Sequence, residues 1–307
     1  MKQKLVVVAG PTASGKTRLA IEIAKRFNGE IVGADSMQIY KYMNIGTAKP
    51  TAEERTEVPH HMIDFLEPDA PYSVAEYTED AHKVIAEIAS RGKLPVMCGG
   101  TGLYINSVVD DVTFGDFETD YALREELQKI AEAEGTQKLL DMLAEFDPES
   151  AKRLHPNNLR RIIRAIEFYK VTGTTISAHQ KMTKERESRY EPIMLSIAWD
   201  RQELYDRINK RVDIMLDEGL FDEVRDMTER GYTKQLNSMQ GIGYKEVMDC
   251  MNGLMTCEEA VELIKQSSRR YAKRQLTWFR RDARINWVSA ENAVEEAIKL
   301  VAEKLDN

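Results

Sequence analysis

An eight-residue segment near the N-terminus has the composition of a phosphate-binding loop. It reads GPTASGKT and fits the pattern G-x-x-x-x-G-K-[ST], in which backbone N–H groups surround a phosphate and a lysine neutralises its oxygens. The hydroxyl of Thr17 is of the kind that ligates Mg²⁺ in such loops, so we predict Thr17 as a metal ligand and Mg²⁺ as a cofactor. The predicted diphosphate- or nucleotide-binding residues are Gly10, Pro11, Thr12, Ala13, Ser14, Gly15, Lys16 and Thr17.

Two polar residues follow other apolar runs of the chain. Asp35 ends EIVGAD, and Thr101 lies in GGTGLY after LPVMC. Open parallel sheets bind ligands at the carboxyl ends of their strands, so both side chains are candidates for the same crevice. Asp35 is equally typical of a helix N-cap, and the glycines beside Thr101 also suit close packing.

A predicted helix over residues 201–218 carries a pair of arginines. Arg207 and Arg211 are four residues apart, hence on one helical face, where two guanidinium groups can clamp a diphosphate. The same spacing also suits a solvated face paired with neighbouring aspartates.

The acid that an ATPase or GTPase usually uses to hold Mg²⁺ is missing from the expected place. The strand predicted over LPVMCGG ends in glycines where a Walker-B aspartate would stand. Asp35 is the acid available instead.

Two basic segments stand out in a chain with a formal charge of −8. Residues 152–170 carry six bases and one acid, and residues 269–284 carry seven bases and one acid interleaved with aromatic side chains. Basic segments are often only solvated faces, but two of them in an acidic chain favour a polyanion such as RNA.

The elements needed to position these residues follow a βα alternation. Short apolar runs at residues 5–10, 30–35, 60–65, 94–100, 192–200 and 285–288 predict strands, with amphipathic helices between them. This predicts an α/β fold, a P-loop-type doubly wound parallel sheet core, interrupted by a mainly helical insertion domain. The predicted boundaries are 1–115 for the first part of the core, 116–190 for the insertion and 191–307 for the second part, which carries the basic C-terminal helix.

Several classes of protein are disfavoured. No apolar run approaches the ~18 residues of a membrane span, the N-terminus is unlike a signal peptide, and the three cysteines have no metal-ligand spacing. We therefore expect a cytoplasmic protein without a membrane partner.

The motifs taken together resemble a known family. GPTASGKT, DSMQIY, IGTAKP, HHMID, GGTGLY, RRIIRAIE, SMQGIGYKE and AKRQLTWFRR occur in this order, and in this the chain is similar to the bacterial tRNA dimethylallyltransferases, also called tRNA isopentenyltransferases. The resemblance implies transfer of a dimethylallyl group from dimethylallyl diphosphate to N6 of the adenosine 3′ of the tRNA anticodon (position 37), with release of diphosphate.

The resemblance also implies roles for individual residues. Asp35 matches the acid proposed to accept the proton of the adenine amine, Thr101 matches a residue between diphosphate and base, and Arg207 and Arg211 complete the diphosphate site. The implied partners are the tRNA anticodon stem-loop and dimethylallyl diphosphate, and we expect a monomer. The implied tRNA-contacting residues are Asp35, Ser36, Met37, Gln38, Thr101, Arg124, Arg160, Arg161, Ile162, Ile163, Arg164, Met239, Gln240, Gly243, Tyr244, Lys245, Arg270 and Arg274.

Two other functions are compatible with the loop. A P-loop kinase of a small metabolite or nucleotide would use the two arginines on ATP and Asp35 on a substrate hydroxyl, but it has no need of two basic segments. An RNA-binding regulator that uses a nucleotide as a switch would need a loop that senses the γ-phosphate, and no such loop is recognisable.

Overall fold

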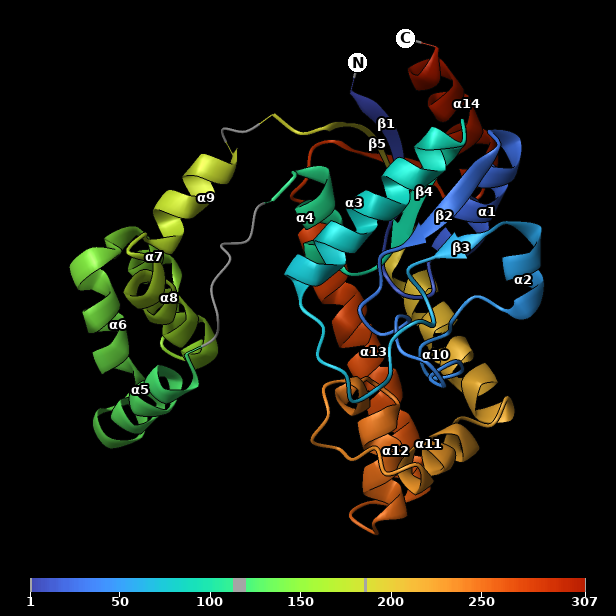
Figure 1. Cartoon of the computed structure of the whole chain (residues 1–307). Helices are drawn as coiled ribbons and strands as arrows, with labels where there is room; N and C mark the ends of the chain where they lie inside the picture. The colour runs from blue at the N-terminus through green and yellow to red at the C-terminus, as the bar shows by residue number, and fades with distance from the viewer. Residues whose placement is uncertain (1, 113–119, 185–186, 307) are drawn as a thin grey trace. The chain divides into compact units, whose positions relative to one another are not determined.

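The computed structural model describes residues 2–112, 120–184 and 187–306 (Figure 1). The chain divides into two compact units: a core unit, Met1–Val109 with Ser188–Asn307, and an inserted unit, Asp110–Glu187. The predicted boundary between residues 115 and 116 lies outside the described residues. The predicted boundary between residues 190 and 191 lies three residues beyond the end of the inserted unit.

The core unit is built on one six-stranded sheet whose pairings are all parallel, which confirms the predicted fold class. The strand order is β3-β2-β4-β1-β5-β6. Since the chain crosses from the β4 side of β1 to the β5 side, the carboxyl end of β1 is the point where the direction of winding reverses, and ligands bind there in such sheets. The strands are β1 (Gln3–Ala9), β2 (Gly29–Gly33), β3 (His60–His61), β4 (Leu94–Gly99), β5 (Tyr190–Ala198) and β6 (Ile285–Ser289).

Helices cover both faces of this sheet. Helices α3 (Val74–Ser90) and α4 (Gly102–Val109) pack on one face, and α1 (Lys16–Arg26) and α14 (Ala293–Leu305) pack on the other. Alternate residues of β1 enter the two cores, Val7 on the α3 side and Val6 and Val8 on the α1 side. Burial on both faces explains why β1 is an unbroken apolar run rather than an alternating one.

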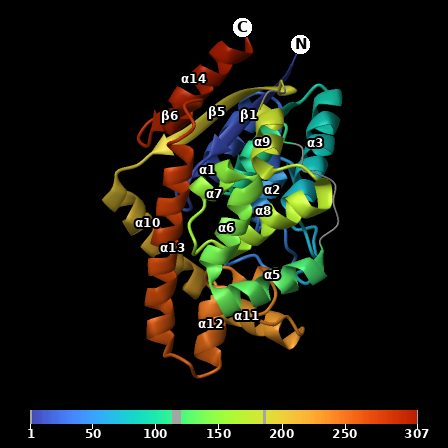
Figure 2. The same ribbon diagram turned by 90° about the vertical axis from the view of Figure 1, so that its left-hand side faces the viewer.

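Four helices extend the core unit beyond the carboxyl edge of the sheet. Helices α10 (Arg201–Asp217) and α13 (Cys257–Phe279) lie side by side, and α11 (Leu220–Glu229) and α12 (Tyr244–Met251) lie at their ends away from the sheet (Figures 1 and 2). These helices share an apolar core with the segment after β2, including Ile39 and Met43. The short helix α2 (Ala52–Glu57) follows that segment and begins with a capping box between Thr51 and Glu54.

The described residues of the inserted unit are helical. Its helices are α5 (Tyr121–Glu134), α6 (Thr136–Phe146), α7 (Pro148–Arg153), α8 (Leu159–Thr172) and α9 (Ile176–Lys184). They have a core of their own, centred on Leu127, Leu139, Leu143 and Ile166. None of the helices described in either unit is long and apolar enough to cross a bilayer.

Candidate active site

The predicted phosphate-binding loop joins β1 to α1 at the switch point of the sheet. Gly15 precedes α1 with φ 89°, a left-handed conformation that favours glycine, and Ala13 has φ 61°. Helix α1 begins with Lys16 and Thr17. The free backbone N–H groups of its first turn, and the positive end of its dipole, are therefore directed towards a ligand held by the loop. This is the local geometry that binds an anion.

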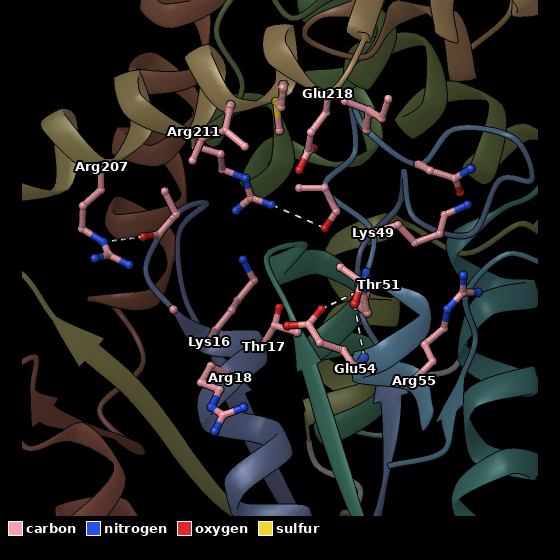
Figure 3. Close-up of a pocket in the computed structure, with 18 of the residues that line it drawn as sticks. Lys16, Thr17, Arg18, Lys49, Thr51, Glu54, Arg55, Arg207, Arg211 and Glu218 are labelled. Carbon is pink, nitrogen blue, oxygen red and sulfur yellow. Dashed lines mark hydrogen bonds between the residues drawn. The ribbon is translucent and has the colours of Figure 1, made fainter. Parts of the chain in front are cut away.

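Only part of the loop lines the large cavity in front of it. The donor pocket, as we call this cavity of about 790 Å³, is lined by Ala13, Gly15, Lys16 and Thr17 of the loop and by residues of α10, α2 and the segment 44–52 (Figure 3). Ser14 is 1% exposed and does not line the pocket. The Ser14 side chain therefore has a structural role, and only the Ser14 backbone is available to a ligand.

The donor pocket is strongly cationic. Seven basic side chains and two carboxylates line it, namely Lys16, Arg18, Lys49, Arg55, Arg207, Lys210 and Arg211 against Glu54 and Glu218. Burial lowers the pKa of both Lys16 and Arg211 because a charged group loses hydration in the protein interior. A bound polyanion would offset that cost, which makes a diphosphate a well-matched ligand.

Arg207 and Arg211 of α10 both contact the walls of the donor pocket, and Arg207 is also exposed to solvent. Arg207 donates from Nε to the carbonyl of Ala13 at 2.9 Å and lies over the Trp199 ring, 4.3 Å from its centroid. Arg211 donates to the carbonyl of Ala48 at 3.4 Å (Figure 3). Both side chains line the donor pocket, as the clamp interpretation of their spacing requires.

A second cavity meets the first at the loop. The acceptor pocket, about 350 Å³, shares Lys16, Thr17 and Arg211 with the donor pocket and contains Asp35 in its wall. A further cavity of about 20 Å³ touches Lys16, Thr17 and Asp35 as well. A ligand whose phosphates lie on the loop can therefore present its other end to Asp35.

Asp35 and Thr101 are brought together by the loops that follow β2 and β4. The Thr101 N–H donates to the carbonyl of Ala34 at 3.1 Å, and the Ser36 N–H donates to Thr101 Oγ1 at 3.0 Å. A Cβ at Gly99 would lie 2.0 Å from the Ala34 carbonyl oxygen, so this close approach requires glycine. Packing explains that glycine, and it also places the Thr101 hydroxyl beside the Asp35 segment.

Asp35 caps a turn, not a helix. Its Oδ1 accepts a hydrogen bond from the Met37 N–H at 2.9 Å, and residues 36–39 form turns. The capping role considered for Asp35 is therefore present, but at a turn and not at a helix. Ser36, Met37 and Gln38 line the acceptor pocket, and Gln38 donates to the carbonyls of residues 47 and 48.

The segment before α12 forms another wall of the acceptor pocket. Gln240, Gly243, Tyr244 and Lys245 line it. Met239 is fully buried in an apolar core, and this burial contradicts the predicted contact of its side chain with RNA.

Tyr244 borders the same pocket, but its side chain is fully buried and its hydroxyl donates to Glu223 at 2.6 Å. Glu223 also accepts from the N–H groups of residues 44, 45 and 46, so Tyr244 helps to fix the loop between the two pockets.

Helix α13 contributes the remaining wall. Arg274 lines the acceptor pocket and lies over the Tyr271 ring, 5.4 Å from its centroid, whereas Arg270 is exposed and lines neither pocket. Tyr271 is also in the wall; burial raises the pKa of its hydroxyl, and Thr101 and Gln275 oppose that rise.

The predicted RNA-contacting residues of the inserted unit divide into three kinds. Arg160 and Arg161 are exposed on α8. Arg124 and Arg164 both bond Glu167, which is fully buried, with Arg124 forming a two-pronged contact at 2.9 Å.

The third kind is buried. Ile162 and Ile163 are 0% and 7% exposed in the core of the inserted unit, which contradicts a side-chain contact with RNA. The physical reason is helical periodicity. With the basic side chains of α8 on its outer face, Ile162 and Ile163 lie on its inner, apolar face.

A magnesium ion has a suitable but incomplete donor set here. Among the described residues no group of three or more His, Cys, Asp or Glu side chains could hold a metal ion, and β4 ends at Cys98 and Gly99 without a Walker-B acid. Thr17 and Asp35 are oxygen donors around the 20 Å³ cavity. This fits Mg²⁺, which keeps several waters and takes substrate phosphates as its other ligands.

Sequence reasoning overlooked several lining residues. Lys49, whose ammonium is held by Asp64 at 2.7 Å, and Arg55 belong to the donor pocket, and the IGTAKP motif was the available signal for the first of them. Gln275 lines the acceptor pocket and stands inside the AKRQLTWFRR motif, which was the available signal for it.

Comparison with known proteins agrees with this geometry. The family model described as IPP transferase matches residues 38–282, and the model described as Isopentenyl transferase matches residues 3–66. The chain is 53% identical to the tRNA dimethylallyltransferase of Caldanaerobacter subterraneus subsp. tengcongensis over 94% of this chain and 92% of that protein. It is 46% identical to that of Halalkalibacterium halodurans over 100% and 99% of the two chains.

Solved structures of tRNA-modifying transferases are also similar to this chain. The tRNA isopentenylpyrophosphate transferase of Bacillus halodurans superposes with a TM-score of 0.75 at 45% identity, covering 99% of this chain and 97% of that one. A eukaryotic dimethylallyltransferase acting on tRNA superposes with a TM-score of 0.83 at 27% identity, covering 99% and 80%.

Proposed function

The chain belongs to the tRNA dimethylallyltransferase family, and on that premise we propose how its site transfers a dimethylallyl group from dimethylallyl diphosphate to N6 of adenosine 37 in tRNA. The observation that carries the proposal is the meeting of two pockets at Lys16, Thr17 and Arg211, with Asp35 in the wall of the second. A site of this form holds a phosphate donor on one side and admits an acceptor on the other. The family relationship supports this reading and not that of a small-molecule kinase.

The diphosphate lies on the loop in the donor pocket. Backbone N–H groups at the start of α1 bind its oxygens, and Lys16, Arg207 and Arg211 supply the charge. These contacts strengthen as charge builds up on the departing diphosphate, so they stabilise the transition state more than the ground state. The loop is then a cradle for a leaving group.

Thr17 and the diphosphate oxygens would hold Mg²⁺. When bound, the ion supplies further neutralisation of the leaving group. The loop itself, residues 10–17, contains no carboxylate, and β4 ends without a Walker-B acid.

The adenine enters the acceptor pocket. Its N6 amine attacks the allylic C1, forming the N6–C1 bond while the C1–O bond to diphosphate breaks. The amine proton passes to the Asp35 carboxylate, which lines this pocket, and Thr101 lies beside Ser36 where its hydroxyl can steady the reacting groups. The adenosine must leave its stack to reach C1, as base-modifying enzymes require.

Replacing Asp35 by asparagine tests this assignment. Asp35→Asn keeps the shape and an oxygen for the Met37 N–H but removes the proton acceptor, so kcat should fall by about 10²- to 10⁴-fold. The affinity for tRNA should change little. Transfer is measured as label from dimethylallyl diphosphate in RNA, and affinity by titration at fixed salt.

Asp80→Asn is the matched control, since Asp80 lies on α3 and bonds Tyr72 and Lys83 away from both pockets. If Asp35→Asn lost tRNA affinity in proportion to kcat, Asp35 would be a base-positioning residue and not the proton acceptor.

A further inference from the structure

Gln275 connects the two halves of the site. It is 5% exposed on α13, its Oε1 accepts from the Thr12 N–H at 3.0 Å, and its Nε2 donates to the Gly100 carbonyl at 2.9 Å. Thr12 belongs to the phosphate-binding loop after β1, and Gly100 belongs to the Thr101 loop after β4. One amide side chain thus spans the gap between the leaving-group side and the acceptor side.

Helix α13 fits closely against the Thr101 loop. A Cβ at Gly100 would lie 2.3 Å from Gln275 Nε2, and a Cβ at Gly102 would lie 2.3 Å from the Trp278 ring. Trp278 also donates to Asn106 Oδ1 at 2.8 Å. The two glycines leave no space between helix and loop, so a displacement of α13 must displace the loop as well.

The same helix faces the acceptor pocket. Tyr271, one turn before Gln275, and Arg274, directly before it, line that pocket together with Gln275 itself. An acceptor that contacts Tyr271 or Arg274 therefore acts on an element that bonds the phosphate-binding loop directly.

We propose that Gln275 is a positioning residue that fixes the distance between the diphosphate cradle and the Asp35–Thr101 loops, and that it couples occupation of the acceptor pocket to affinity for the donor. The proposal rests on the function proposed above. An uncharged amide suits this role because it has an acceptor for the Thr12 N–H and a donor for the Gly100 carbonyl at the end of one side chain. If either of these buried groups lacked its hydrogen bond, the fold would lose stability.

Two substitutions separate the hydrogen bonds from simple packing. Gln275→Met keeps the length and removes both bonds, and we expect kcat to fall about 10- to 100-fold because the reacting groups are misplaced. Gln275→Glu keeps the acceptor for Thr12 but, when ionised, cannot donate to Gly100. Protonation restores a donor, so kcat of this variant relative to wild type should recover as the pH is lowered.

Binding measures the coupling itself. Inorganic diphosphate is titrated in the presence of Mg²⁺ with and without a saturating, unmodified anticodon stem-loop. In the wild type the RNA should increase diphosphate affinity by about 5-fold or more, and in Gln275→Met the ratio should approach one. Thr277→Ala is the control on the same helix, since Thr277 is exposed and bonds only the Lys273 carbonyl of its own helix.

Unchanged kcat and unchanged coupling in Gln275→Met would overturn the proposal. So would a variant whose thermal stability falls while kcat, corrected for folded protein, and the coupling ratio stay at wild-type values, because Gln275 would then only stabilise the fold. A wild type that binds RNA and diphosphate cooperatively but transfers no dimethylallyl group would contradict the proposed function and leave the coupling intact.

Discussion

Lys16 and Arg211 are the cations that line both pockets, and their surroundings show what the site is built to receive. Burial lowers the pKa of each. Arg211 lowers the pKa of Lys16 further and Arg207 lowers that of Arg211, whereas the Asp35 charge opposes both shifts. Glu218 and Glu54 oppose the shift of Arg211 as well, yet its pKa remains lowered, so the carboxylates present do not offset burial. A diphosphate supplies the missing negative charge, and its departure after transfer restores the original balance.

The basic residues of α8 are not equivalent. Glu167 accepts hydrogen bonds from Arg124, Arg164 and the Asp120 N–H, so these two arginines are held in fixed orientations by a buried acid. Arg160 and Arg161 are exposed, and they are the residues whose removal tests RNA contact without leaving a buried carboxylate unpaired.

The double variant Arg160→Ala, Arg161→Ala should bind tRNA more weakly. It should also reduce the slope of log affinity against log salt by about 1 to 2, because up to two phosphate contacts are lost. Filter binding or anisotropy over a salt series measures both quantities. Lys129→Ala on α5, where Lys129 is exposed and pairs with Glu125, is the control. Equal slopes for variant and wild type would mean that this face of α8 is merely solvated.

At the scale of elements, an ion cluster joins the starts of β2 and β4. Glu30 of β2 is 4% exposed and accepts from His61 at 2.6 Å, Arg91 at 2.6 Å and Lys93 at 2.8 Å. Burial alone would raise the pKa of Glu30, but the bonds from Lys93, His61 and Arg91 outweigh it and lower the pKa to about 2. The charged carboxylate thus stabilises the pairing of these strands.

Stability should accordingly depend on Glu30 in acid. Its contribution is complete above the ordinary pKa of 4.5 and is lost as the pH falls from there towards 2, since the folded state holds the proton less tightly than the unfolded one. Glu30→Gln should lower the free energy of unfolding at pH 7 by roughly 2–3 kcal/mol.

Urea unfolding at several pH values tests this expectation. The difference between Glu30→Gln and wild type should shrink as the pH falls from 5 to about 2.5. Glu191→Gln removes an exposed partner of Lys4 and should have little effect at any pH. A constant difference across the acid range would show that Glu30 does not act through its charge.

The elements that were predictable from sequence are those with a strong local pattern. The six strand segments have such a pattern, and the structure has a strand at each of them. The third strand was predicted at residues 60–65 but spans only His60–His61, because only these residues pair with β2. Tertiary pairing, which the local sequence does not encode, sets that limit.

The part of the site that one contiguous loop forms was predictable from the sequence. The parts that several distant elements form together were less predictable. The phosphate-binding loop is a contiguous motif with its own backbone geometry, so its place was correct. Gln275 and Glu223 act through contacts with residues more than 170 positions away, so the local sequence does not show which loops they hold. The family resemblance implied RNA contacts for Ile162, Ile163, Met239 and Tyr244, but their side chains are buried in cores.

At the scale of the whole molecule, the chain separates catalysis from an added helical unit. The core unit contains both pockets, and the inserted unit has an independent core and an exposed basic face on α8. This division agrees with an enzyme whose small donor is handled by one folding unit and whose large acceptor needs an additional surface.

In the proposed function, the phosphate-binding loop holds a leaving diphosphate and not a γ-phosphate for transfer. The most direct test incubates the protein with Mg²⁺, unmodified tRNA and dimethylallyl diphosphate labelled in its allyl group, beside a tube with ATP in place of the labelled donor. We predict label in RNA at adenosine 37, with one diphosphate released per label, and no RNA-dependent consumption of ATP. RNA without label, together with acceptor-dependent hydrolysis or transfer from ATP, would contradict the account.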